Sequence, residues 1–247
     1  MMRYMAADFL RIIKRIPRII ALVLVFGITG YIFYFFNKDG KTSVYELVDI
    51  LVKIVPYISA VFGLAELISV YSDDFKAKTM QVAIGSGIGR PQVILVKWLE
   101  TGILCLFDYL FFIVLIFVLS SIQGISFSGG PAVDVILLFV FGWVKAFVCI
   151  GMTQILLFGT LSFSGGVLLY LGLCSGIAGG LVSLLLDAEI ISSLRLSSYL
   201  FTNLLEVAQS RAIIGTISLP QLLGILLYAA VSFVLSCLLF RKREMEF

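Results

Sequence analysis

Residues 146–186 read AFVCIGMTQILLFGTLSFSGGVLLYLGLCSGIAGGLVSLLL, and none of these 41 residues carries a charge. A single α-helix of this length would be about 60 Å long, because each residue adds ~1.5 Å. That is twice the ~30 Å hydrocarbon core of a bilayer. We therefore expect the segment to fold back on itself within the glycine- and serine-rich stretch 159–166.

The composition of the whole chain is that of an integral membrane protein. Of the 247 residues, 61% are hydrophobic and 13% are charged, and the mean hydropathy is +1.12. In a soluble domain about a quarter of the residues are charged. The net charge of +3 does not indicate a nucleic-acid partner. The chain has no histidine and four isolated cysteines, so we expect no histidine-dependent catalysis and no metal site.

Six apolar runs are long enough to cross a bilayer. The sequence therefore predicts an all-α membrane protein with a single transmembrane domain over residues 1–247. Its spans are expected at about 19–36, 47–71, 92–122, 133–158, 167–186 and 219–240. An even number of spans places both termini on the same side of the membrane.

The basic residues indicate which side this is. Four of them (Lys38, Lys41, Arg195 and Arg211) flank the side opposite the termini, and Lys53 and Lys145 lie within spans. The other twelve flank the terminal side: Arg3, Arg11, Lys14, Arg15, Arg18, Lys76, Lys78, Arg90, Lys97, Arg241, Lys242 and Arg243. Because cytoplasmic loops carry an excess of lysine and arginine, both termini are predicted to be cytoplasmic.

Two further segments are too polar to be spans. Residues 2–16 place Met5, Phe9 and Ile12 on one apolar face, which predicts an amphipathic helix lying flat in the cytoplasmic interface and separated from the first span by Pro17. Residues 187–218 mix apolar and charged positions. There we expect short helices on the outer side that pack on the bundle or dip into the outer leaflet.

The connection between spans two and three contains GSGIGRP at residues 85–91. Three alternating glycines suggest a phosphate-binding loop, but a dinucleotide loop needs a preceding strand, and a P-loop needs Gly-Lys-Ser/Thr. Neither is present. We expect instead a short helix over residues 75–84, capped by Asp73 or Asp74 and ended by Gly85, with Pro91 in the first turn of the next span.

A few charged and small residues inside the spans are further candidates. Asp108 and Lys145 lie near the middle of spans three and four, and we predict that they form an ion pair, either structural or functional. Glu66 and Glu100 lie toward the cytoplasmic ends of their spans, where they line a transport path or are solvated or paired. The spacing of Gly172, Gly176 and Gly180 predicts close helix packing, either within one subunit or at a seam between two.

The connection also resembles a known family. Residues 74–79 (DFKAKT), 87–90 (GIGR), Gln92 and Lys97 are similar to the segment after span two of ABC-2-type transporter permeases. The chain departs from that pattern at Lys78, where glycine is usual, and at Gly89, where serine is usual. The six spans, interfacial helix and outer segment before span six also match the family layout.

This resemblance implies a permease subunit of an ATP-driven exporter in a bacterial plasma membrane, similar to those that export amphipathic peptide antibiotics or bacteriocins. The connection would be a coupling helix that docks on a separate ATPase. The residues implied in docking are Phe75, Lys76, Lys78, Thr79, Met80, Val82, Gly85, Gly87 and Arg90. This chain would bind no cofactor itself. ATP and Mg would be bound by two partner ATPase subunits, and a second permease subunit, identical or related, would complete the transporter among membrane lipids.

Other functions remain open at this stage. The chain could be a channel or secondary transporter that acts alone, although we see no inverted repeat between its halves. It could be a membrane-embedded enzyme using Glu66, Glu100 and Asp108, although no motif surrounds them. Within the exporter interpretation, lipid, polysaccharide and sodium are less favoured cargoes than peptides.

Overall fold

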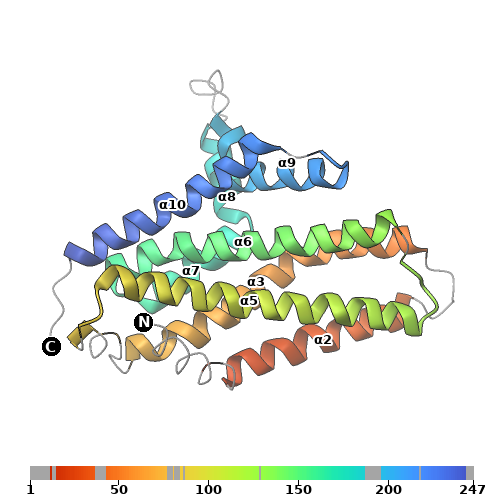
Figure 1. The fold of residues 1–247 in the computed structure, drawn as a ribbon, viewed down its shortest axis with the longest axis horizontal. Helices are drawn as coiled ribbons and strands as arrows, with labels where there is room; N and C mark the ends of the chain where they lie inside the picture. Colours follow the sequence, from red (N-terminus) through yellow and green to blue (C-terminus); the bar gives the residue numbers. More distant parts are fainter. Residues whose placement is uncertain are drawn as a thin grey trace.

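The computed structural model describes residues 12, 15–36, 43–76, 80, 84–85, 87–127, 129–186, 196–216 and 218–242. All regular structure within these residues is helical, which confirms the all-α prediction. Figure 1 shows long helices lying side by side in a bundle, with a smaller group of helices against one face.

Four long helices form the bundle. They are α2 (Ile16–Phe36), α3 (Val44–Lys76), α5 (Arg90–Ile122) and α6 (Gly130–Thr160). The smaller group consists of α7 (Phe163–Cys174), α8 (Ile177–Leu186), the 3-10 helix η2 (Leu196–Tyr199), α9 (Phe201–Ile213) and α10 (Leu219–Lys242). Among the described residues, five of these helices are each long and apolar enough to cross a membrane, and the bent pair α7–α8 together makes a sixth candidate span.

The fold-back predicted within residues 159–166 is confirmed. Helix α6 ends at Thr160 and α7 begins at Phe163, and the two helices pack against each other. The Ser162 side chain caps α7 by accepting a hydrogen bond from the backbone N–H of Gly165 at 3.3 Å. Length and apolarity thus predict that the segment turns, and the glycine- and serine-rich stretch predicts where.

The fifth span is not the continuous helix that the sequence predicts for residues 167–186. Helices α7 and α8 meet at an angle of 67°. The break falls at Ser175 and Gly176, and Gly176 has φ +81°, a left-handed conformation that favours glycine. Gly172 and Gly180 therefore lie on different helices and cannot form one straight row.

Two predicted helix starts are also wrong. Helix α2 begins at Ile16, so Pro17 lies in its first turn, where a missing N–H costs nothing, and the break before the span falls at Arg15 instead of Pro17. Helix α3 continues through Asp73 and Asp74 to Lys76, so neither residue caps a new helix. The predicted interfacial helix at 2–16 lies outside the described residues, except for Ile12, Arg15 and Ile16.

The segment before the last span contains short packed helices, as predicted. Helix α9 buries Phe201, Leu204, Leu205 and Ala208 against its neighbours α6 and α10. Gly224 of α10 allows this contact, because a Cβ at that position would be 2.8 Å from a methyl group of Leu204.

Helices α2 and α10 lie along opposite halves of α5. Phe26 of α2 stacks near Phe111 and Phe112 in the second half of α5, whereas α10 contacts α5 through Arg90 and Trp98 in the first half. The first turns of α10 are thus level with the middle of the bundle, beside α9, as Figure 1 shows.

Candidate functional site

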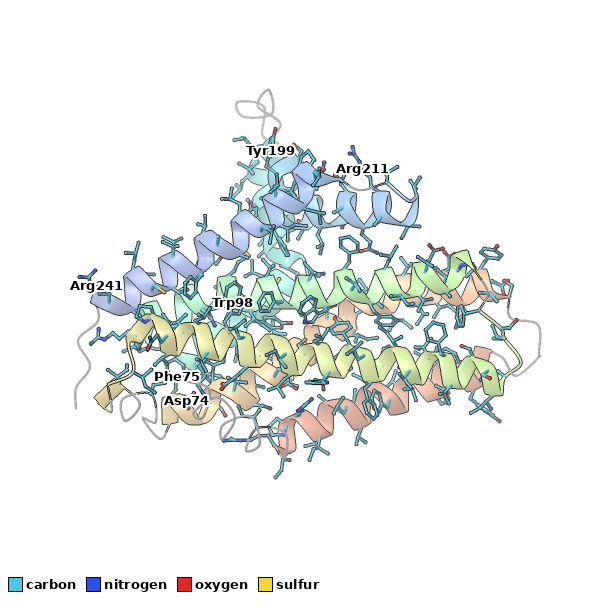
Figure 2. All side chains as sticks on the ribbon, viewed as in Figure 1. Asp74, Phe75, Trp98, Tyr199, Arg211 and Arg241 are labelled. Atoms are coloured by element: carbon cyan, nitrogen blue, oxygen red, sulfur yellow. The ribbon has the colours of Figure 1, made fainter. Side chains whose placement is uncertain are left out.

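The connection between α3 and α5 lies where several helices meet at one end of the bundle. Phe75 near the end of α3 packs against Phe158 of α6 and Phe163 of α7, with ring centroids 6.4 Å apart in both pairs. Figure 2 shows Asp74 and Phe75 at the same end of the molecule as Arg241 of α10. This end of the molecule therefore brings together helices that are distant in sequence.

Arg90 fastens the start of α5 to the end of α10. Its guanidinium donates hydrogen bonds to the backbone carbonyl oxygens of Phe240 at 2.9 Å and Arg241 at 3.1 Å. It also lies 5.5 Å from the centre of the Phe240 ring. The last carbonyls of a helix lack intrahelical partners and carry partial negative charge, so an arginine there stabilises the contact.

The residues of the predicted coupling helix face in two directions. Phe75 is half-buried, and Met80 is only 5% exposed within the same apolar cluster as Phe158. Gly85 and Gly87 are exposed, as is Pro91. Lys78, Thr79, Val82 and the side chain of Lys76 lie outside the described residues. Phe75 and Met80 therefore hold the connection on the bundle, and its exposed residues among those described are Gly85, Gly87, Gly89 and Pro91.

Arg18, not Lys145, is the partner of Asp108. Arg18 Nη2 lies 2.6 Å from Asp108 Oδ1, and Arg18 Nε lies 2.8 Å from Glu66 Oε1. All three side chains are buried. The predicted Asp108–Lys145 pair is therefore wrong: the first turn of α2 inserts Arg18 between α3 and α5. One cation between two carboxyl groups leaves either a net negative charge or a protonated carboxyl inside the bundle.

A second buried charge network lies nearer the connection. Lys97 Nζ on α5 is 2.7 Å from Asp74 Oδ2 on α3 and 3.6 Å from Glu100 Oε2. Lys97 and Glu100 are both 0% exposed. Gln154 of α6 donates a hydrogen bond to the Tyr71 hydroxyl on α3. Glu100 is thus paired and enclosed. This supports a paired, structural role for Glu100 over a solvated position on a transport path.

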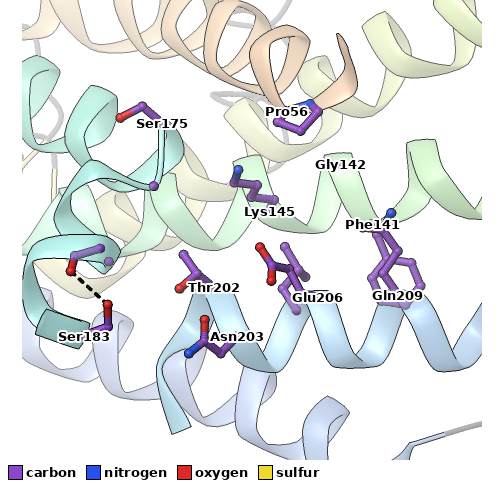
Figure 3. A pocket seen from close by; sticks show the side chains of 14 residues that line it. Pro56, Phe141, Gly142, Lys145, Ser175, Ser183, Thr202, Asn203, Glu206 and Gln209 are labelled. Atoms are coloured by element: carbon purple, nitrogen blue, oxygen red, sulfur yellow. Dashed lines mark hydrogen bonds between the residues drawn. The ribbon is translucent and has the colours of Figure 1, made fainter. Parts of the chain in front are cut away.

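Lys145 instead lines a cavity of about 390 Å³ between α3, α6, the α7–α8 break and α9. Its polar lining is Lys145, Ser175, Ser183, Thr202, Asn203, Glu206 and Gln209. Figure 3 shows the Lys145 and Glu206 side chains extending into this space from α6 and α9. Within the described part of the chain, no ion pair or hydrogen bond joins either side chain to another residue.

The glycines that the sequence singles out for packing make no close contacts with the described residues. The nearest atom to a Cβ built at Gly172 is 3.9 Å away, and nothing in the described residues lies within 4 Å of one at Gly180. Close approaches occur elsewhere, at Gly63, Gly102 and Gly166. The described residues thus give no support for close packing at Gly172 and Gly180 within one subunit, and a seam between two subunits remains a prediction.

Sequence reasoning missed Arg18, Lys97 and Glu206 as site residues. Arg18 and Lys97 belong to the twelve basic residues that predict the cytoplasmic side, yet both are buried. Without them, ten basic residues remain on the terminal side against four on the other, so the predicted orientation of the chain in the membrane is unchanged. The position of Pro17 was the available signal, because proline is common in the first turn of a helix and places Arg18 within the span.

The described residues also bear on metal binding and on family membership. They contain no group of three or more cysteine, aspartate or glutamate side chains arranged to hold a metal ion. Comparison of the chain with protein-family models, with curated proteins and with solved structures found no match.

Proposed function

We propose that this multi-pass membrane protein is the permease subunit of an ATP-driven exporter, with the α3–α5 connection as the surface that docks on a separate ATPase. The observation that supports this is the anchoring of the connection. Phe75 joins it to α6 and α7, Arg90 joins it to α10, and the Asp74–Lys97 pair joins α3 to α5. A push at the connection would move five helices together.

The proposed cargo is an amphipathic molecule, with a peptide antibiotic or bacteriocin as the best candidate. A second permease subunit and two ATPase subunits would complete the transporter, with both termini in the cytoplasm. The basis for the cargo is the compact size of the chain, 247 residues with little predicted outside the membrane, which resembles ABC-2-type permeases that serve peptide antibiotics.

Site-specific crosslinking tests the docking surface. A photo-crosslinking amino acid at Pro91, which is exposed beside Arg90, should capture an ATPase subunit in membranes of the native host. The same residue at Ser126, exposed in the turn between α5 and α6 at the other end of the bundle, should capture none. Capture from Ser126 instead of Pro91, or transport in liposomes without any ATPase, would contradict the proposal.

The buried charges favour a second candidate, a proton-coupled transporter that acts alone. Arg18 between Glu66 and Asp108 resembles the carboxylate relays of pumps, because membrane-buried acidic residues often carry protons. The two candidates differ in energy source. Purified protein in liposomes should move cargo under a pH gradient if this second candidate is right, and only with ATP and an ATPase if the first is right.

A further inference from the structure

We propose that the Lys145 cavity binds a zwitterionic head group carried on an apolar tail, such as that of phosphatidylethanolamine. In such a ligand Lys145 would neutralise the phosphate, and Glu206 would accept hydrogen bonds from the ammonium group. This inference does not depend on an ATPase, and it concerns a site separate from the docking surface.

The first observation is that two opposite charges line one cavity without pairing. Lys145 and Glu206 both extend into it (Figure 3), yet no described residue lies within salt-bridge distance of either. A lysine within a span is costly unless something neutralises it. A ligand with both an anionic and a cationic group would satisfy the two side chains at once.

The second observation is a set of polar groups suited to phosphate oxygens. Thr202 and Gln209 line the cavity, and within the described residues neither side chain is hydrogen-bonded. Thr202 Oγ1 lies only 3.0 Å from the position that a Cβ at Gly179 would occupy, so glycine is needed for α8 and α9 to approach here. Hydroxyl and amide donors beside a lysine are the usual ligands of a phosphate group.

The third observation concerns the apolar surroundings and the size of the cavity. Pro56, Phe141 and Leu205 complete its wall, and the neighbouring helix α8 exposes Leu181, Leu184 and Leu185. The cavity of about 390 Å³ is near the lower end of the ~300–1,000 Å³ range of small-molecule sites. It therefore has room for a head group, while an acyl chain would lie along the exposed leucines outside.

The fourth observation is the level of the cavity relative to α10. Helix α9 packs on the first turns of α10, where Phe201 contacts Tyr228 and Leu204 contacts Gly224. The first turns of α10 are level with the middle of the long bundle helices, so the cavity beside α9 lies alongside the spans and not beyond their ends. A ligand that reaches a cavity at this level passes the exposed leucines of α8, which favours a molecule with an apolar tail, a membrane lipid, over a soluble ligand.

The test uses the full chain in nanodiscs of phosphatidylglycerol that contain a small fraction of photo-crosslinkable phosphatidylethanolamine. The probe should crosslink to α6 or α9 despite the excess of anionic lipid. Lys145→Met and Glu206→Gln should each lower the yield at least tenfold. Lys53→Met, which removes an exposed lysine of α3 that does not line the cavity, should leave the yield unchanged.

Competition distinguishes the two possible sources of such a ligand. Unlabelled phosphatidylethanolamine should displace the probe, and free phosphoethanolamine should not. Equal displacement by phosphoethanolamine would overturn the lipid assignment in favour of a soluble zwitterion. Equal yields from Lys145→Met and Lys53→Met would overturn the site itself. Glu206 is exposed on α9, so Glu206→Gln tests the site even if Lys145→Met does not fold.

Discussion

The residues next to Arg18 in the sequence, a proline before it and two isoleucines after it, do not indicate that its side chain is buried and paired. In the structure its guanidinium bridges Glu66 and Asp108, and Arg18 itself is 7% exposed. Breaking a buried ion pair by removing one partner costs about 3–5 kcal/mol, because the other charge remains buried and uncompensated. Removing Arg18 should therefore leave Glu66 and Asp108 buried without their cation.

Arg18→Met should lower the free energy of unfolding by about 3–5 kcal/mol. Lys145→Met should change it by less than about 1 kcal/mol in either direction, because Lys145 has no ion-pair partner in the described residues. Unfolding in mixed micelles, followed by tryptophan fluorescence, would measure both. Adding Glu66→Gln and Asp108→Asn to Arg18→Met should recover part of the loss. Similar losses for the two single variants would contradict the partner assigned to Asp108.

At the scale of helices, close packing depends on glycines that no sequence motif identified. Gly63 of α3 faces the Tyr170 side chain of α7, whose hydroxyl donates a hydrogen bond to the Ser59 carbonyl oxygen at 2.6 Å. The Tyr109 hydroxyl of α5 donates to Ser59 Oγ, also at 2.6 Å. These contacts join α3, α5 and α7 through a single turn of α3, so there is little room for an added methyl group.

Gly63→Ala should destabilise the protein by about 1–3 kcal/mol, the usual cost of inserting a methyl group into a packed site. Its new Cβ would lie 1.9 Å from the Tyr170 hydroxyl oxygen. Gly27→Ala is the matched control on the exposed face of α2, where no described atom lies within 4 Å of a new Cβ. The control should be neutral or stabilising by up to about 1 kcal/mol. Thermal unfolding of both variants in detergent compares them, and equal melting temperatures would exclude the tight contact.

At the scale of the whole molecule, the chain reverses direction at two opposite ends. The α6–α7 turn lies at the end that contains the α3–α5 connection, because Phe75 contacts Phe163 there. The α5–α6 turn lies at the other end of the bundle, because α5 runs for 33 residues from the connection to this turn. The excess of basic residues near the connection predicts that this end is cytoplasmic.

Labelling of single cysteines should confirm this orientation. In a cysteine-free background, Ser126→Cys in the α5–α6 turn and Ser164→Cys in the first turn of α7 are matched, exposed substitutions. A membrane-impermeant maleimide should label Ser126→Cys in intact cells and Ser164→Cys only after the membrane is opened. The reverse pattern would place the α3–α5 connection outside the cell and would exclude ATPase docking there.

The amino-acid sequence by itself determined the class of the protein, the number of apolar segments and the turn within residues 159–166. It could do so because hydropathy and span length are local properties: charge-free stretches longer than a bilayer must reverse. The sequence misplaces the helix boundaries near Pro17 and Asp74. A charged residue inside a span looks like a residue at the end of a helix until its ion-pair partner is known.

Only the tertiary structure decided which charges pair, which glycines are crowded and where the fifth span bends. Arg18 and Asp108 are 90 residues apart in sequence. Lys97 of α5 pairs with Asp74 of α3. The same side chains in the same spans are compatible with many pairings, and Asp108 with Lys145 was one of them. The choice among these pairings follows from the way the helices are offset along one another, since that offset places Arg18 level with Asp108 and leaves Lys145 beside α9.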